Sequence, residues 1–293
     1  MSRFGRVLTA MATPFGADGA LDLEGAATLA RWLVEHGSDG VVVAGTTGEA
    51  PTLTKSEHLE LIRTVREALP DHTVVAGAGS NDTRHAIEMT ETVTDIGVDA
   101  VLTVSPYYNK PPQTGIEASF RAIAASTDLP IIVYDVPGRT GRRIAHDVLV
   151  RLFTEVPTCV AFKDATGDPA GAARLMADVP DLVLYSGDDS LTLPRLAVGA
   201  VGVIGVSTHW AGTEFGEMIA AADKGDLALA REINARLQPT FAYSNSDTCV
   251  FSQSVKVMMR ELGVDIGECR LPLGPAPDGT DERARAVLEA LRG

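Results

Sequence analysis

The sequence contains little cysteine and no long apolar run. Its three cysteines, Cys159, Cys249 and Cys269, are odd in number and show no paired spacing. This pattern argues against a disulfide framework or a zinc knuckle and fits a reducing compartment. No stretch approaches the roughly 18 consecutive apolar residues that indicate a membrane span, and the first residues lack the apolar segment of a signal peptide. We therefore expect a cytoplasmic protein.

Basic residues are scarce relative to acidic ones. The 293 residues include 25 lysines and arginines against 39 aspartates and glutamates, a net charge of −14. A surface of this sign repels phosphate backbones and anionic lipids, so we expect neither nucleic acid nor a membrane as a partner. Anionic substrates would need cations placed close to their binding site.

Several catalytic motifs are missing as well. The six histidines show no H-E-x-x-H or other metal-ligand spacing, and no G-x-S-x-G elbow is present. Gly77-Ala78-Gly79 lacks the third glycine of the dinucleotide-binding pattern G-x-G-x-x-G. These absences disfavour a metal hydrolase, a serine hydrolase of the elbow type and a dinucleotide-binding sheet.

What the sequence does contain is an eightfold alternation of a short apolar run and a candidate helix. Buried parallel strands appear as continuous apolar runs, and eight such units match a (β/α)8 TIM barrel better than an open sheet. We predict this α/β barrel for residues 1–225. The eight runs are Val7–Met11, Gly40–Ala44, Thr73–Ala76, Ala100–Val104, Ile131–Tyr134, Val160–Phe162, Leu182–Tyr185 and Val201–Val206.

Residues 226–293 show helical spacing without further strands. We predict a C-terminal helical domain there, as an extension of the barrel. Met258 and Met259 follow Val255 at helical spacing. We expect them to pack in the core rather than to line a binding site.

Lys163 stands at the end of the sixth apolar run, before a turn that contains Gly167. A lysine that leaves a buried strand loses part of its hydration, which lowers its pKa and can supply a free amine for a Schiff base. Pairing with Asp164 at the strand end is the alternative from the residues alone.

Other strand ends also carry polar groups. The Gly45–Glu49 turn can bind a carboxylate through its N–H groups or be a simple turn. Tyr134 can transfer protons or simply bond the backbone, and Arg139 can bind a carboxylate or remain solvated. Tyr107 and Tyr108 cannot both face one barrel mouth, so we expect one to reach a neighbouring subunit.

Taken together, these motifs resemble the dihydrodipicolinate synthase and N-acetylneuraminate lyase family. The order and spacing match over essentially the whole barrel and weaken in the C-terminal helices. The matching segments are Gly45–Glu49, Pro106–Pro111, Tyr134–Gly141, Lys163–Asp168 and Ser186–Asp189.

The resemblance implies a class I aldolase that uses a lysine. Lys163 would form the imine with pyruvate, and Thr46 and Thr47 would bind the pyruvate carboxylate. Tyr134 would move protons to and from the imine intermediates. The relay would run through Thr47 and through Tyr108 of the adjacent subunit.

The remaining implications concern the acceptor and the assembly. Arg139 would bind the carboxylate of L-aspartate-4-semialdehyde, and the backbones of Gly187 and Ile204 would border the pyruvate site. The product would be 4-hydroxy-tetrahydrodipicolinate, for lysine and diaminopimelate synthesis. The resemblance implies no metal or organic cofactor and a homotetramer built from two tight dimers.

Two alternatives stay open at this point. A sibling aldolase, such as N-acetylneuraminate lyase or a keto-deoxy sugar acid aldolase, would share Lys163. Arg139 favours a short acid semialdehyde over a polyol tail. A non-catalytic paralogue that binds a keto acid is the second alternative, and the complete set of Lys163, Tyr134, Thr47 and Tyr108 opposes it.

The chain departs from the family in three places. Gly205 takes the place of a serine that is frequent after the last strand. The Val250–Lys256 stretch replaces a proline-rich segment, which leaves its role open. In the pocket that binds lysine in inhibited members, Lys55 stands in place of a histidine and His85 in place of a glutamate, whereas three residues match: His58, Asn81 and Tyr107. Because the acidic partner is lost and Lys55 repels a cation, we expect weak or absent lysine inhibition.

Overall fold

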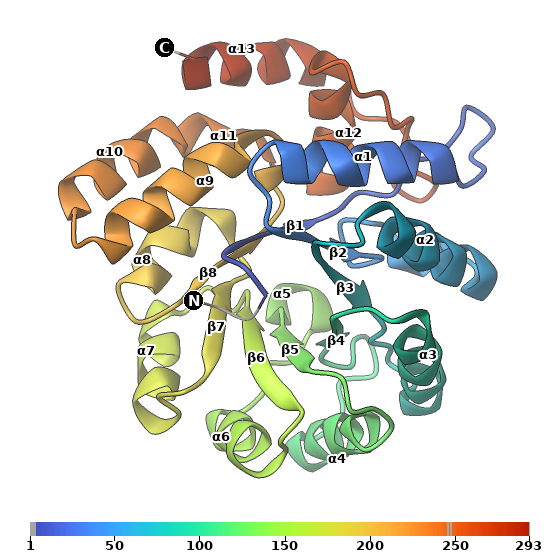
Figure 1. The fold of residues 1–293 in the computed structure, drawn as a ribbon, viewed down its shortest axis with the longest axis vertical. Helices are drawn as coiled ribbons and strands as arrows, with labels where there is room; N and C mark the ends of the chain where they lie inside the picture. Colours follow the sequence, from blue (N-terminus) through green and yellow to red (C-terminus); the bar gives the residue numbers. More distant parts are fainter. Residues whose placement is uncertain (1–3, 245, 247, 293) are drawn as a thin grey trace. The chain divides into compact units, whose positions relative to one another are not determined.

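The computed structural model describes residues 4–244, 246 and 248–292. Its sheet is a closed barrel of parallel strands that follow one another in chain order, as predicted (Figure 1). The strands are β1 (Val7–Ala10), β2 (Gly40–Val43), β3 (Thr73–Gly77), β4 (Ala100–Val104), β5 (Ile131–Asp135), β6 (Cys159–Asp164), β7 (Val183–Ser186) and β8 (Gly202–Gly205).

The described chain divides into two compact units, and the first comprises residues 75–204. Its apolar core lies between the strands and the helices that follow them, and it includes Phe120, Val133, Leu152, Phe162 and Leu184. The helices of this unit are α3 (Thr83–Ile96), α4 (Gln113–Ala124), α5 (Pro137–Thr140), α6 (His146–Glu155), α7 (Pro169–Asp178), the short helix η2 (Asp189–Leu191) and α8 (Thr192–Leu196).

The second unit comprises residues 4–74 and the described residues from 205 to 292. Within it, α9 packs on β1 and α10, and α12 packs on α9 and α13. Its helices are α1 (Leu23–Glu35), the short helix η1 (Ala50–Thr52), α2 (Lys55–Ala68), α9 (Thr208–Asp223), α10 (Leu227–Arg236), α11 (Gln238–Ser244), α12 (Phe251–Glu261) and α13 (Thr280–Arg292). The expected boundary at residue 225 stays a prediction.

Local sequence signals explain several of these elements. Thr54 and Glu57 form the predicted capping box at the start of α2, in which each side chain bonds the other residue's backbone N–H. The expectation for the methionines is also confirmed, because Met258 and Met259 are completely buried on α12. Strand β7 ends one residue later than predicted, at Ser186, since that residue still pairs with Asp164 of β6.

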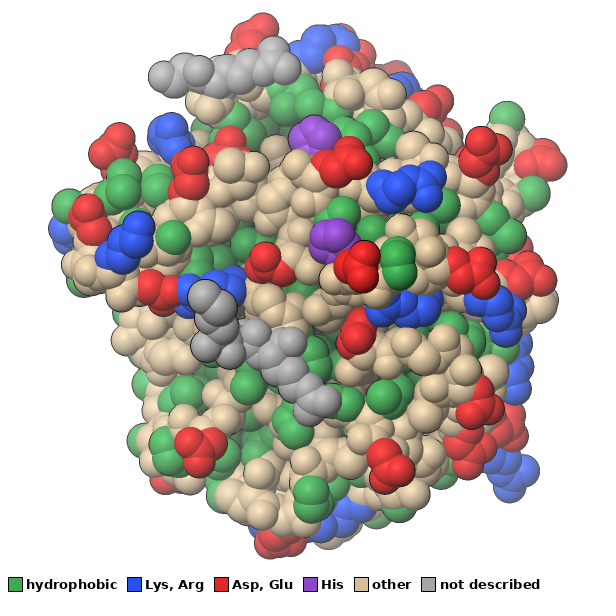
Figure 2. Space-filling view, viewed as in Figure 1, with side chains coloured by type: hydrophobic (Ala, Val, Ile, Leu, Met, Phe, Trp, Pro, Cys, Tyr) green, Lys and Arg blue, Asp and Glu red, His purple; other side chains and the backbone are tan. Residues whose placement is uncertain are grey.

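The surface reflects the acidic composition. On the face in view, Figure 2 shows acidic side chains distributed among basic ones. Among the described residues, no helix is long and apolar enough to cross a membrane.

Candidate active site

Lys163 lies one residue before the end of β6, between two tyrosines on the neighbouring strands. Tyr134 of β5 and Tyr185 of β7 are its partners in register. In parallel strands, residues in register present their side chains on the same face. The Lys163 Nζ lies 4.4 Å from the centre of the Tyr134 ring. The structure therefore brings together the amine and the phenol that the sequence predicted as a pair.

The surroundings of Lys163 favour an uncharged amine. Only 6% of the residue is exposed. This burial lowers the pKa of Lys163 from 10.5 to about 8. The Asp189 and Asp188 carboxylates oppose the fall, and the Arg139 guanidinium adds to it. At pH 7, about a tenth of such an amine is neutral, against about 0.03% at a pKa of 10.5. This amine can attack a carbonyl carbon near neutral pH.

Asp164 does not pair with Lys163. Its side chain accepts a hydrogen bond from Arg195 Nε at 3.1 Å, and Arg195 Nη1 donates to Ser186 Oγ at 3.2 Å. Both members of the Asp164–Arg195 ion pair are buried. Because successive side chains alternate between the faces of a strand, this pair lies on the face opposite Lys163. Through these contacts Arg195 connects the ends of β6 and β7.

The loop after β7 approaches β6 through its backbone. Gly187 donates its N–H to the carbonyl of Asp164 at 2.7 Å. A Cβ at Gly187 would lie 3.0 Å from both that carbonyl and the Ala165 side chain, so a larger residue would crowd the loop. Ile204 lies buried on β8 in the same unit.

Arg139 lies on α5, directly after β5. The helix starts with Pro137 and is followed by its C-cap, Gly141, in the left-handed conformation with φ of 74°. The protein atoms around the guanidinium lower the pKa of Arg139, and the nearby Tyr134 opposes this effect. An arginine remains charged at any physiological pH despite such a change. The structure thus places the cationic guanidinium of Arg139 near the Tyr134 phenol.

Tyr108 differs from the other candidate residues because its side chain projects into solvent. It is 88% exposed and adopts a left-handed backbone conformation, with φ of 70°. The adjacent Tyr107 is half-buried. Aromatic residues are enriched at protein interfaces.

Thr46 and Thr47 belong to the second unit, in the turn after β2. Thr47 is buried and Thr46 half-buried. The turn is held by its own backbone, since the N–H of Glu49 donates to the carbonyl of Thr46 at 3.1 Å. Thr13 Oγ1 also donates to the carbonyl of Gly48 at 2.6 Å.

Sequence reasoning missed two buried cations, Arg195 and Lys256. Arg195 forms an ion pair with Asp164 of β6, and Lys256 on α12 faces Glu49 at 3.6 Å. A weak signal existed for Lys256, which stands alone among Val255, Val257 and Met258 in the sequence. Arg195 shows no comparable signal.

Two other features do not belong to this arrangement. A cavity of about 320 Å³ opens between α6 and α7, lined by Arg143, His146, Phe162 and Asp168 among others, and Lys163 does not line it. Within the described residues, no three histidine, cysteine, aspartate or glutamate side chains are grouped as they would be to hold a metal ion.

Comparisons with known proteins extend over nearly the whole chain. Residues 3–291 match the family model described as the Dihydrodipicolinate synthetase family. The 4-hydroxy-tetrahydrodipicolinate synthase of Acidothermus cellulolyticus is 49% identical, over 98% of this chain and 92% of that protein. The enzyme of the same name from Thermosynechococcus vestitus is 46% identical, over 99% and 98%. The crystal structure of dihydrodipicolinate synthase from Cyanidioschyzon merolae with lysine bound has a TM-score of 0.95 and 42% identity, over 99% and 98%.

Proposed function

Because the chain belongs to the dihydrodipicolinate synthetase family, we propose that it condenses pyruvate with L-aspartate-4-semialdehyde to 4-hydroxy-tetrahydrodipicolinate. The observation that carries this proposal is the buried amine of Lys163, with its lowered pKa, 4.4 Å from the Tyr134 ring. This combination suits an enzyme that forms a covalent imine. It would serve the synthesis of lysine and diaminopimelate, in the cytoplasm.

The reaction begins with attack of the neutral Lys163 amine on the keto carbon of pyruvate. Loss of water gives an imine, whose positive charge lets the methyl group release a proton to form an enamine. The enamine carbon then attacks the aldehyde carbon. Finally, the amine of the acceptor replaces Lys163 on the former keto carbon, which closes the ring and frees the enzyme. The two substrates thus yield one product and one water.

The other candidate residues have distinct roles in this proposal. Tyr134 donates and accepts the protons, relayed by Thr47 and by Tyr108 of a neighbouring subunit. Thr46 and Thr47 bind the pyruvate carboxylate, and the backbones of Gly187 and Ile204 border it. Arg139, a cation near Tyr134, binds the carboxylate of the aldehyde substrate. All substrates are small molecules, and the imine on Lys163 needs no further cofactor.

A substrate assay tests the proposal. Purified protein is incubated with pyruvate and L-aspartate-4-semialdehyde, and in parallel with N-acetylneuraminate. We expect turnover of the first pair only, and none with Lys163→Arg, which keeps the charge but cannot form the imine. Cleavage of N-acetylneuraminate instead would identify a sibling aldolase. Imine formation without turnover of any aldehyde would favour the non-catalytic binding protein.

We also propose a homotetramer of two tight dimers, supported by the exposure of Tyr108. Mixed subunits test whether Tyr108 acts across an interface. Tyr108→Phe and Lys163→Met, each nearly inactive alone, are unfolded together and refolded. Random pairing leaves one intact site in each mixed dimer, so about a quarter of the wild-type activity should return. No recovery in verified mixed dimers would contradict the shared site.

A further inference from the structure

The turn that carries Thr46 and Thr47 ends in Glu49, whose side chain is turned into the protein. Glu49 is 3% exposed, and its backbone is left-handed, with φ of 55°. Few residues other than glycine adopt this conformation without support from their surroundings. The position of the Glu49 side chain and the shape of the turn are therefore linked.

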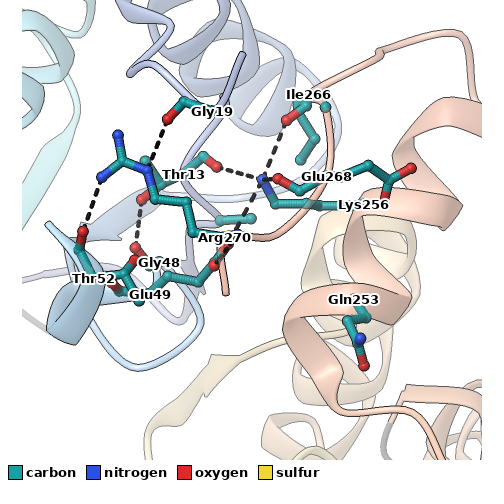
Figure 3. A network of polar contacts seen from close by, with 12 residues as sticks. Thr13, Gly19, Gly48, Glu49, Thr52, Gln253, Lys256, Ile266, Glu268 and Arg270 are labelled. Carbon is teal, nitrogen blue, oxygen red and sulfur yellow. Dashed lines mark hydrogen bonds and ion pairs between the residues drawn. The ribbon is translucent and has the colours of Figure 1, made fainter. Parts of the chain in front are cut away.

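The Glu49 carboxylate is held from the C-terminal part of the same unit (Figure 3). Its Oε2 accepts a hydrogen bond from the backbone N–H of Arg270 at 2.9 Å. Its Oε1 lies 3.6 Å from Lys256 Nζ and accepts no hydrogen bond within the described residues. Lys256 thus supplies the positive charge that faces this oxygen.

Lys256 itself is completely buried on α12. Its Nζ donates to three backbone carbonyls, those of Thr13 at 2.8 Å, Glu268 at 3.0 Å and Ile266 at 3.3 Å. An ammonium has three N–H donors, whereas a neutral amine has two and would turn its lone pair toward a carbonyl oxygen. The three contacts therefore favour the charged form.

The two charges stabilise each other. Burial lowers the pKa of Lys256, and the Glu49 carboxylate raises it. Burial likewise raises the pKa of Glu49, and Lys256 lowers it. Removing one partner would leave a buried charge without its counter-charge, which proteins tolerate poorly.

We propose that Lys256 and Glu49 are positioning residues, whose buried ion pair ties α12 to the Thr46–Thr47 turn and sets the affinity for the carboxylate of the keto acid. This inference rests on the proposed function. Both residues act through the turn. Glu49 is its last residue, and Lys256 contacts both the Glu49 carboxylate and the carbonyl of Thr13. Thr13 in turn donates its hydroxyl to the carbonyl of Gly48 in the turn. The pair thereby gives the divergent Val250–Lys256 stretch a role in pyruvate binding.

Three variants test the pair: Lys256→Met, Glu49→Gln and the double variant. We expect the KM for pyruvate to rise at least tenfold in each single variant, because the displaced turn presents its donors poorly. The KM for the aldehyde should stay within twofold. In the double variant, the KM for pyruvate should not exceed that of the singles, since each single already removes the shared interaction and the double leaves no unpaired charge. If the increase in the KM for pyruvate in the double variant equals the product of the two single increases, the residues act independently, which would contradict the inference.

A matched control separates positioning from a general loss of stability. Tyr243 of α11 donates its hydroxyl to the carbonyl of Ser254 on α12 at 3.0 Å, a buried contact that does not involve the turn. Tyr243→Phe should lower the melting temperature and leave the KM for pyruvate within twofold. An equal rise in this KM at an equal loss of melting temperature would overturn the inference. If Lys256→Met does not fold, Glu49→Gln decides, because its amide still accepts from Arg270.

Borohydride trapping with pyruvate distinguishes this inference from the function on which it rests. The wild-type protein should be trapped at low pyruvate, and the folded variants only at concentrations at least tenfold higher. If variants and wild type are trapped at the same pyruvate concentrations, only the positioning role of Lys256 and Glu49 is refuted, and the proposed function stands. Failure to trap the wild-type protein would remove the proposed function and this inference together.

Discussion

Replacing Lys163 by methionine should make the protein more stable while it abolishes imine formation. A buried amine whose pKa falls from 10.5 to about 8 is penalised in its charged form. At about 1.4 kcal/mol for each pKa unit, the penalty at pH 7 is about 3 kcal/mol. Methionine has a similar length and no charge, so Lys163→Met removes this cost. An active site that lowers the stability of its own fold is a common consequence of function.

The stability advantage of Lys163→Met over wild type should depend on pH. Below pH 8 the amine is charged in both states, and the whole penalty applies to the folded protein. Between pH 8 and 10.5 the unfolded chain binds more protons, so wild-type stability rises with pH and the advantage of Lys163→Met shrinks, to about 1.4 kcal/mol at pH 9.5. Above pH 10.5 the advantage disappears.

Thermal unfolding at pH 7 and pH 9.5 measures the difference. With an unfolding entropy of about 2.1 cal/mol/K for each residue, about 3 kcal/mol raises the melting temperature of this chain by about 5 °C. Lys224→Met, at an exposed position, is the control and should change stability by less than about 0.5 kcal/mol. A Lys163→Met variant that is no more stable than wild type at pH 7 would refute the claim that burial of the charged Lys163 amine destabilises the fold.

Three further changes test the surroundings of the amine and the lysine pocket. Asp189→Asn removes a carboxylate that raises the pKa of Lys163, so the acid limb of the pH profile for imine formation should move to lower pH; a limb that stays in place or moves upward would count against this electrostatic role. Arg139→Leu should raise the KM for the aldehyde by about 10- to 100-fold, because a charged hydrogen bond is lost, while pyruvate trapping continues; an unchanged KM would exclude Arg139 from the acceptor site. Lysine up to about 1 mM should leave the reaction rate unchanged, since Lys55 repels its ammonium groups; half-inhibition below that concentration would contradict the prediction.

The sequence predicted those features of the site that depend on local order along the chain. A continuous apolar run predicted the buried strand β6, and the position of Lys163 near its end placed the amine at the carboxyl end of the barrel. The same reasoning placed Tyr134 one strand away, and the register of β5 and β6 confirms that the two residues are neighbours.

Contacts between distant segments could not be predicted in this way. Arg195 reaches Asp164 across 31 residues, and Lys256 reaches the carbonyl of Thr13 across 243. Neither contact can be predicted from periodicity or from a motif, because tertiary packing alone brings the segments together. The exact strand ends also depend on such contacts, as at Ser186, whose hydroxyl accepts a hydrogen bond from Arg195.

Borohydride reduction in the presence of pyruvate, followed by peptide mass mapping, examines the chemistry of Lys163 directly. We expect one reduced pyruvate adduct for each chain, on the peptide that contains Lys163, with formation that increases as the pH rises toward 8. An adduct on a different lysine, or no adduct at saturating pyruvate, would contradict the role of this buried amine as the nucleophile.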